Sequence, residues 1–174
     1  MAGRASLLLL LPGLGCATSL SGSVAPALDS TGALGHEERV EASAVLGTPA
    51  VRMGASVAGT AGRLGALDSG YGGFALGGTV EGGRDLVWSA TSFYGPRFPF
   101  GGGGVVHGGG VAVQALFRVA RAGGESGAYL LGPRLSFEAL FGDGLRPIAR
   151  ERLGYLQLGL VVRWTTFDTT GKSF

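Results

Sequence analysis

The segment from Tyr155 to Phe167 constrains the fold more than any other part of the chain. Its residues alternate between two sides with a period of two. The first side holds Leu156, Leu158, Leu160, Val162 and Trp164, and the second holds Tyr155, Gln157, Gly159, Val161, Arg163 and Thr165. Successive side chains of a β-strand point to opposite faces, so this pattern predicts a strand with one apolar face and one mostly polar face. A tilted strand of about 9–11 residues is also long enough to cross a bilayer.

Length and composition favour one folded domain. The chain has 174 residues, 35 of them glycine, but 45% of its residues are hydrophobic and its net charge is only +2. Disordered chains combine low hydrophobicity with high net charge, so we exclude disorder for the body of the chain. No run of 18 apolar residues occurs, which excludes a transmembrane helix. Because no basic cluster is interleaved with aromatic residues, we also expect no nucleic-acid binding.

The N-terminus has the pattern of an export signal. Arg4 precedes an apolar run from Leu7 to Leu11, and small residues follow. We therefore assign residues 1–15 to a signal peptide. Leu14-Gly15-Cys16 resembles the lipobox of bacterial lipoproteins, although that family prefers leucine where Gly13 stands here. The resemblance implies cleavage before Cys16 and lipidation of that cysteine, whereas an ordinary signal would be cleaved after Ala17.

The next segment, residues 16–37, is rich in Ser, Thr, Gly, Ala and Pro. This composition predicts a flexible tether. The only strand we expect in it lies within residues 19–35 and contains Pro26, which cannot donate a hydrogen bond to a neighbouring strand.

The body of the protein, residues 38–167, repeats the period-two pattern. Six further strands are predicted at about residues 39–46, 51–58, 74–81, 86–91, 111–119 and 134–141. Tight turns join several of them, and strands joined in this way are antiparallel. We expect long loops at 95–110 and 142–154 and a short tail at 168–174. The fold class is therefore all-β.

The polar faces of these strands carry charges of both signs. They are Arg39, Glu41, Arg52, Glu81, Asp85, Arg118, Arg134, Glu138 and Arg163. A barrel of about eight strands has an interior just wide enough for side chains to fill. Because buried charges need partners, we predict an ion-pair network inside a filled polar lumen. The opposite faces, including Leu156, Leu158, Leu160, Val162 and Trp164, would then contact lipid.

A soluble arrangement with the two faces reversed is the alternative. It would be an exported, lipid-tethered β-sandwich or lipocalin-like module that binds a partner or an apolar ligand in its core. The polar faces are a poor water-exposed surface, however, because Lys172 is the only lysine and many of their positions are glycine or alanine. We therefore favour the barrel with the polar residues inside.

Signal, alternating strands and turns of unequal length together resemble the small eight-stranded outer-membrane barrels of bacteria. The resemblance covers about residues 38–174 and implies a closed antiparallel up-and-down barrel with an even strand count, short periplasmic turns and longer outer loops. It requires the eighth strand within residues 19–35. In that family the last strand usually ends at the final aromatic residue, but here Asp168 to Lys172 lie between the apolar run and Phe174.

Few residues suggest chemistry. His36 and His107 are the only histidines, and neither has further ligands at a suitable spacing, so we expect no metal site, no cofactor and no catalysis. Arg146, Arg150 and Arg152 fall in the last long loop and could bind anionic lipid headgroups. The function expected from the sequence is a structural or interaction barrel of the outer membrane. The sequence does not indicate an oligomeric state.

Overall fold

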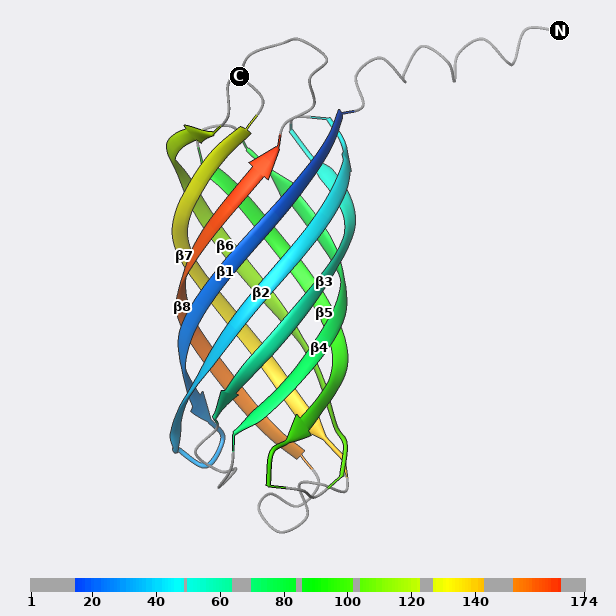
Figure 1. Ribbon diagram of the computed structural model, residues 1–174, viewed down its shortest axis with the longest axis vertical. Coiled ribbons are helices and arrows are strands. Elements are labelled where there is room, and N and C mark those ends of the chain that lie inside the picture. Colours follow the sequence, from blue (N-terminus) through cyan, green and yellow to red (C-terminus); the bar gives the residue numbers. More distant parts are fainter. Residues whose placement is uncertain are drawn as a thin grey trace, which may run out of the picture.

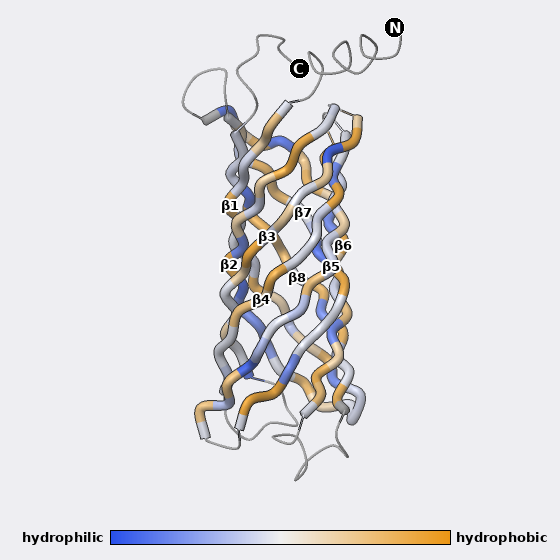
Figure 2. The backbone as a smooth tube through the Cα atoms, turned by 90° about the vertical axis from the view of Figure 1, so that its right-hand side faces the viewer, coloured by the Kyte–Doolittle hydropathy of each residue, from blue (hydrophilic) through white to orange (hydrophobic). Residues whose placement is uncertain are grey.

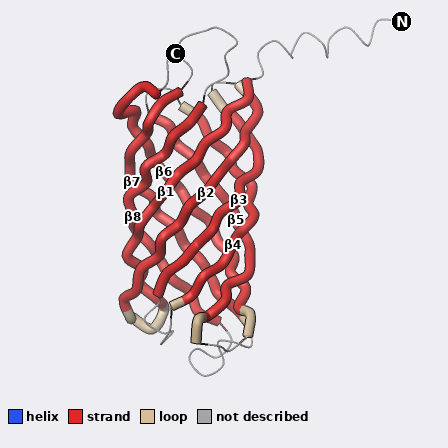
Figure 3. The backbone as a smooth tube through the Cα atoms, viewed as in Figure 1, coloured by secondary structure: helices blue, strands red, loops and turns tan. Residues whose placement is uncertain are grey.

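The computed structural model is a closed barrel of eight antiparallel strands, each hydrogen-bonded to its neighbours in chain order (Figure 1). It describes residues 15–48, 50–63, 70–83, 86–101, 104–122, 127–142 and 152–166. The strands are β1 (Gly15–Asp29), β2 (Leu34–Gly47), β3 (Arg52–Arg63), β4 (Tyr71–Gly82), β5 (Leu86–Pro99), β6 (Val106–Ala122), β7 (Gly127–Phe141) and β8 (Arg152–Thr166). Strands make up nearly all of the described chain (Figure 3). The predicted fold class is confirmed, including the even strand count.

The strands are strongly tilted. Following paired residues once around the barrel from Trp164 leads back to Gly154 on the same strand, so the register shifts by ten residues in one circuit. A stagger of this size in an eight-stranded barrel goes with a strand tilt of about 35–45°. Such a barrel is narrow, and the side chains on its inner faces meet across the lumen.

The first strand is longer than predicted. β1 spans Gly15–Asp29 and pairs with β2 and β8, so the segment expected to be a tether is mostly strand, and the barrel begins near residue 15 instead of residue 38. Its inward positions are small, including Ala17, Ser19 and Ser21, and its outward positions include Leu20 and Val24. Ser, Thr and Ala fit a narrow lumen as well as they fit a linker, and composition alone could not separate the two.

The prediction of a long loop at 95–110 is also wrong, because β5 continues to Pro99 and β6 begins at Val106. Three glycines of this segment, Gly95, Gly108 and Gly110, lie within strands where neighbouring backbone or side chains approach closely. A Cβ on Gly108 would collide with the carboxylate of Glu138, and a Cβ on Gly110 would collide with the carbonyl oxygen of Phe137. The strand glycine Gly108 thus leaves space for the lumen network and is not a sign of a loop, whereas Gly101 and Gly104 do fall in the connection between β5 and β6.

Proline interrupts the hydrogen-bonded ladders without ending the strands. The β1–β8 ladder stops at Val24–Leu160 and resumes in the same register at Ala27–Gln157, beyond Pro26. The β4–β5 and β6–β7 ladders have equivalent gaps at Pro96 and Pro133. A closed barrel has no edge strand on which to place proline, so the local ladder opens instead.

The two ends of the barrel differ. β1 begins and β8 ends at the same end, which we call the terminus end, while the opposite end is the loop end (Figure 1). The connections at the terminus end span residues 48–51, 83–85 and 123–126, whereas those at the loop end span 30–33, 64–70, 100–105 and 142–151. The longer connections therefore gather at the loop end.

Candidate functional site

The two faces of the barrel wall have opposite chemistry. On β8, the outward side chains of Leu156, Leu158, Leu160, Val162 and Trp164 have exposed fractions of 48, 63, 57, 53 and 38%. The intervening Gln157, Arg163 and Thr165 are buried in the lumen. The same alternation follows the other strands, and Figure 2 shows it as changing colour along each tube. The apolar residues lie outside and the charged residues mostly inside, the reverse of a water-soluble protein.

One ion-pair cluster lies toward the terminus end of the lumen. Glu81 on β4 accepts from two arginines: Arg163 Nη1 is 3.0 Å from Oε2, and Arg52 Nη1 is 3.5 Å from Oε1. Arg163 also donates to Gln114 Oε1 at 2.9 Å and to Ser89 Oγ at 3.3 Å. The Arg163 guanidinium of β8 therefore reaches three neighbouring strands, β4, β5 and β6.

A second cluster lies near the middle of the lumen. Glu41 Oε2 is 3.1 Å from Arg39 Nε and 3.4 Å from Arg134 Nη1. The Arg39 guanidinium also lies over the Phe93 ring, 4.4 Å from its centroid, in cation–π geometry. One carboxylate is thus shared between two arginines, as at Glu81.

The third cluster lies toward the loop end. Arg97 Nη2 and Glu138 Oε1 are 2.7 Å apart, and both side chains are almost completely buried. Beside them, the Tyr71 hydroxyl donates to Glu37 Oε2 at 2.6 Å, and the Tyr155 hydroxyl donates to the same oxygen at 3.2 Å. Sequence reasoning missed Glu37 and Arg97 because they fell in the supposed tether and loop. The continued alternation from Trp88 to Arg97 was the signal that could have found Arg97.

Two groups of buried apolar side chains also fill the lumen. One group, near the loop end, is formed by Ala27, Tyr71, Val106, Leu140, Leu153 and Tyr155. Another is formed by Val87, Leu116, Ala128, Leu130 and Val161. Side chains therefore fill the lumen at several levels, as expected for a barrel of this strand number.

The remaining predicted site residues have mixed positions. Arg118 is half-buried on an inward-facing position of β6. Cys16 is exposed on the outer face at the start of β1. Arg152 is the first residue of β8. Residues 1–14 of the predicted signal peptide, together with Asp85, Arg146, Arg150 and the tail at 168–174, lie outside the described residues.

Aromatic side chains form two bands on the outer wall. Trp88, Phe117, Tyr129 and Trp164 are exposed toward the terminus end, and Tyr129 pairs directly with Trp164. At the loop end, the His107 ring stacks on Tyr94 and on Phe141 with centroids 5.8 and 6.1 Å apart, and the Tyr94 hydroxyl lies 3.0 Å from His107 Nδ1. His107 is thus part of an aromatic cluster on the wall.

Within the part of the chain that the structure describes, no helix is long and apolar enough to span a membrane. No protein-family model matches the sequence, and no curated protein sequence matches it.

Two solved structures resemble the barrel. The crystal structure of Neisserial surface protein A is 15% identical, with a TM-score of 0.45, covering 86% of this chain and 96% of that chain. A structure described as "De novo design of transmembrane beta-barrels" is 12% identical, with a TM-score of 0.41, covering 83% of this chain and 94% of the design.

Proposed function

We propose that the chain is an integral barrel of the bacterial outer membrane, with a structural or interaction role and no catalysis. The observation that carries this proposal is the inversion of the two faces. Charged groups pair inside the lumen, while Val, Leu and aromatic side chains cover the outside. Monomeric soluble proteins rarely expose contiguous apolar patches larger than a few hundred Å². Hydrocarbon solvates such a wall, and a closed barrel leaves no unpaired strand edge in it.

The two aromatic bands support the same arrangement. Aromatic girdles mark both membrane–water interfaces of outer-membrane barrels, flanking an apolar band about 25 Å tall. Trp88 and Trp164 lie in one band and Tyr94 in the other, with Val and Leu between them. By the same reasoning, the short turns at the terminus end face the periplasm and the longer loops face outward.

Further contacts with the membrane are part of the proposal. Cys16 points outward at the terminus end, so a lipid attached there would enter the adjoining leaflet directly. Arg146, Arg150 and Arg152 belong to the last connection and the start of β8, at the loop end. In our proposal they contact anionic headgroups.

The soluble lipid-tethered alternative needs the apolar faces packed together inside and the charged faces in water. A lipid tether would then hold it to the membrane. The observed faces have the opposite orientation, because Leu158 is 63% exposed and Arg163 is 2% exposed.

The proposal is tested with membranes from cells that produce the full chain, washed in alkaline carbonate. We expect both the wild-type protein and a Cys16→Ala variant to stay with the membrane, and to show a gel mobility that shifts on heating. Mass analysis of the mature N-terminus separates cleavage before Cys16 from cleavage after Ala17. Release of Cys16→Ala as soluble protein would contradict the barrel and support the tethered module.

A further inference from the structure

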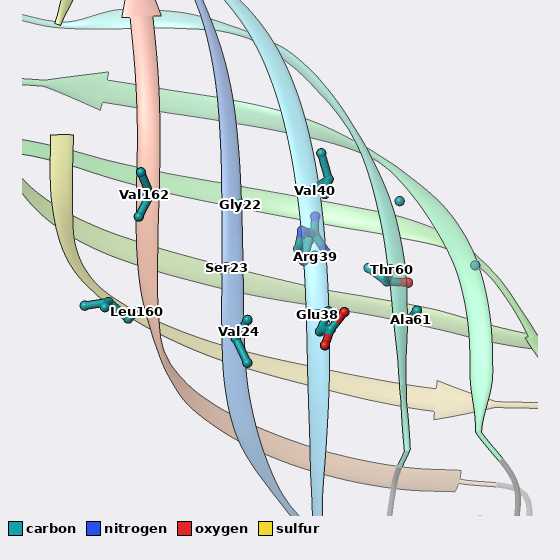
Figure 4. A pocket seen from close by; sticks show the side chains of 12 residues that line it. Gly22, Ser23, Val24, Glu38, Arg39, Val40, Thr60, Ala61, Leu160 and Val162 are labelled. Carbon is teal, nitrogen blue, oxygen red and sulfur yellow. The ribbon is translucent and has the colours of Figure 1, made fainter. Parts of the chain in front are cut away.

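The outer wall formed by β1, β2 and β3 differs from the rest of the barrel. Among the described residues, its outward positions carry no Phe, Tyr or Trp side chain. It contains a groove of about 630 Å³ whose lining includes Val24, Val40 and Leu160 (Figure 4). Exposed aromatic side chains lie on β4 to β8, whereas the outward side chains of β1 to β3 are smaller and leave a groove.

The groove has a ridge with a hollow on either side. Val40 projects from β2, and its ladder partners on both neighbouring strands are glycines, Gly22 on β1 and Gly59 on β3. A Cβ placed on either glycine would meet nothing within 4 Å. A second identical wall, turned by a two-fold rotation, would present a Val40 ridge to each hollow, which is the self-complementarity of a symmetric dimer.

Glu38 places a carboxylate in this apolar groove. It is exposed on the outer face, and its ladder partners are Val24 and Ala61. Val24 in turn pairs with Leu160, in the middle of the apolar stripe of β8. Within the described part of the chain, Glu38 makes no ion pair or hydrogen bond. An ionisable group at membrane depth is costly and usually marks a functional contact.

The same wall also carries a positively charged side chain close to Glu38, that of Arg63. Arg63 is exposed at the end of β3 and pairs with His36, two residues from Glu38 along β2. Glu38 and Arg63 are not paired with each other within the chain. In a two-fold arrangement, each copy can offer its arginine to the other copy's carboxylate, which would give two reciprocal ion pairs. Anionic lipid headgroups would instead be repelled by Glu38.

We propose that the β1–β3 wall is the contact surface of a homodimer, with each Val40 in the partner's glycine hollow and each Glu38 paired with the partner's Arg63. This inference rests on the proposed membrane location, because the wall must lie in hydrocarbon for the carboxylate to require a partner. The ion pair sits at a contact from which water is excluded, where removing one partner leaves the other charge buried and unpaired.

The test is sedimentation equilibrium of the full chain in density-matched detergent. We expect a dimer for the wild type and weaker association after charge reversal: Glu38→Arg and Arg63→Glu should each raise the dimer Kd at least about tenfold. The double variant, which restores opposite charges across the interface, should recover the dimer. Gly59→Leu should also dissociate it by filling the hollow, whereas Ala90→Leu, the same side chain on the outward face of β5, should not.

Each variant is also checked for the heat-shifted gel mobility of a folded barrel. The proposed dimer is wrong if the wild-type protein shows the heat shift but is monomeric, or if the Glu38→Arg variant shows the heat shift and stays dimeric. Neither result would contradict the membrane barrel. A lipid or other protein occupying the groove would give that monomeric result. Loss of the heat shift in the wild type itself would instead count against the proposed function.

Discussion

Glu81→Gln is expected to lower the free energy of unfolding by about 3–5 kcal/mol, the cost of removing one partner from a buried ion pair. Glu81 is the carboxylate that both Arg52 and Arg163 contact, and it is 4% exposed. Glutamine keeps the size and loses the charge, so two arginines would remain near each other in the lumen without their shared anion. The measurement is equilibrium urea unfolding in phospholipid vesicles, followed by the fluorescence of Trp88 and Trp164.

Two further variants distinguish the loss of this ion pair from a general disturbance of the fold. Arg121→Gln removes an exposed charge near the end of β6 and should change stability by less than about 0.5 kcal/mol. Adding Arg163→Met to Glu81→Gln should recover part of the loss, because it removes one of the two buried arginines that Glu81→Gln leaves without a carboxylate. A Glu81→Gln protein as stable as wild type would mean that the lumen charges are not held by pairing.

Leu158→Arg is expected to cost about 2–4 kcal/mol, the penalty for arginine near the midplane on the lipid face of a barrel. Leu158 is 63% exposed near the middle of β8, and it lies outside the groove of the β1–β3 wall. Because the side chain points away from the lumen, the substitution disturbs no internal packing. The loss of stability would come from placing a charge in the hydrocarbon around the wall, and the same vesicle unfolding experiment measures it.

The matched control is Leu34→Arg at the first residue of β2, where the side chain is 75% exposed. Near the interface the same substitution costs only about 0–1 kcal/mol. A depth-dependent difference between the two variants is thus the expected signature of a bilayer. Equal and negligible effects at both positions would indicate water on both, as in the soluble alternative.

The outer and inner faces could be predicted from the sequence wherever large apolar residues alternate with polar ones. β8 is the clearest case, since five consecutive outward positions are Leu, Leu, Leu, Val and Trp. The same period-two alternation identified the central residues of β2 through β7. The additional strand that became β1 was predicted from the even strand count, since an even count brings both chain ends to the same side of the barrel.

The ends of strands and part of the lumen could not be predicted. Glycine fits both a loop and a crowded inner wall, and only the positions of neighbours such as Glu138 distinguish them. Tyr71 and Tyr155 show the same limit, because their shared partner Glu37 lies far away in sequence and is brought close only by closure of the barrel. The pairing of one carboxylate with two arginines likewise depends on the register shift.

The central claim is that the apolar wall faces hydrocarbon, and the chain carries its own probes for it. It contains two tryptophans, Trp88 and Trp164, which are 42% and 38% exposed on the outer wall. In vesicles made with lipids brominated at shallow acyl positions, we expect strong quenching of their fluorescence and little quenching by acrylamide added to the water. Strong acrylamide quenching with no effect of the brominated lipid would contradict the account.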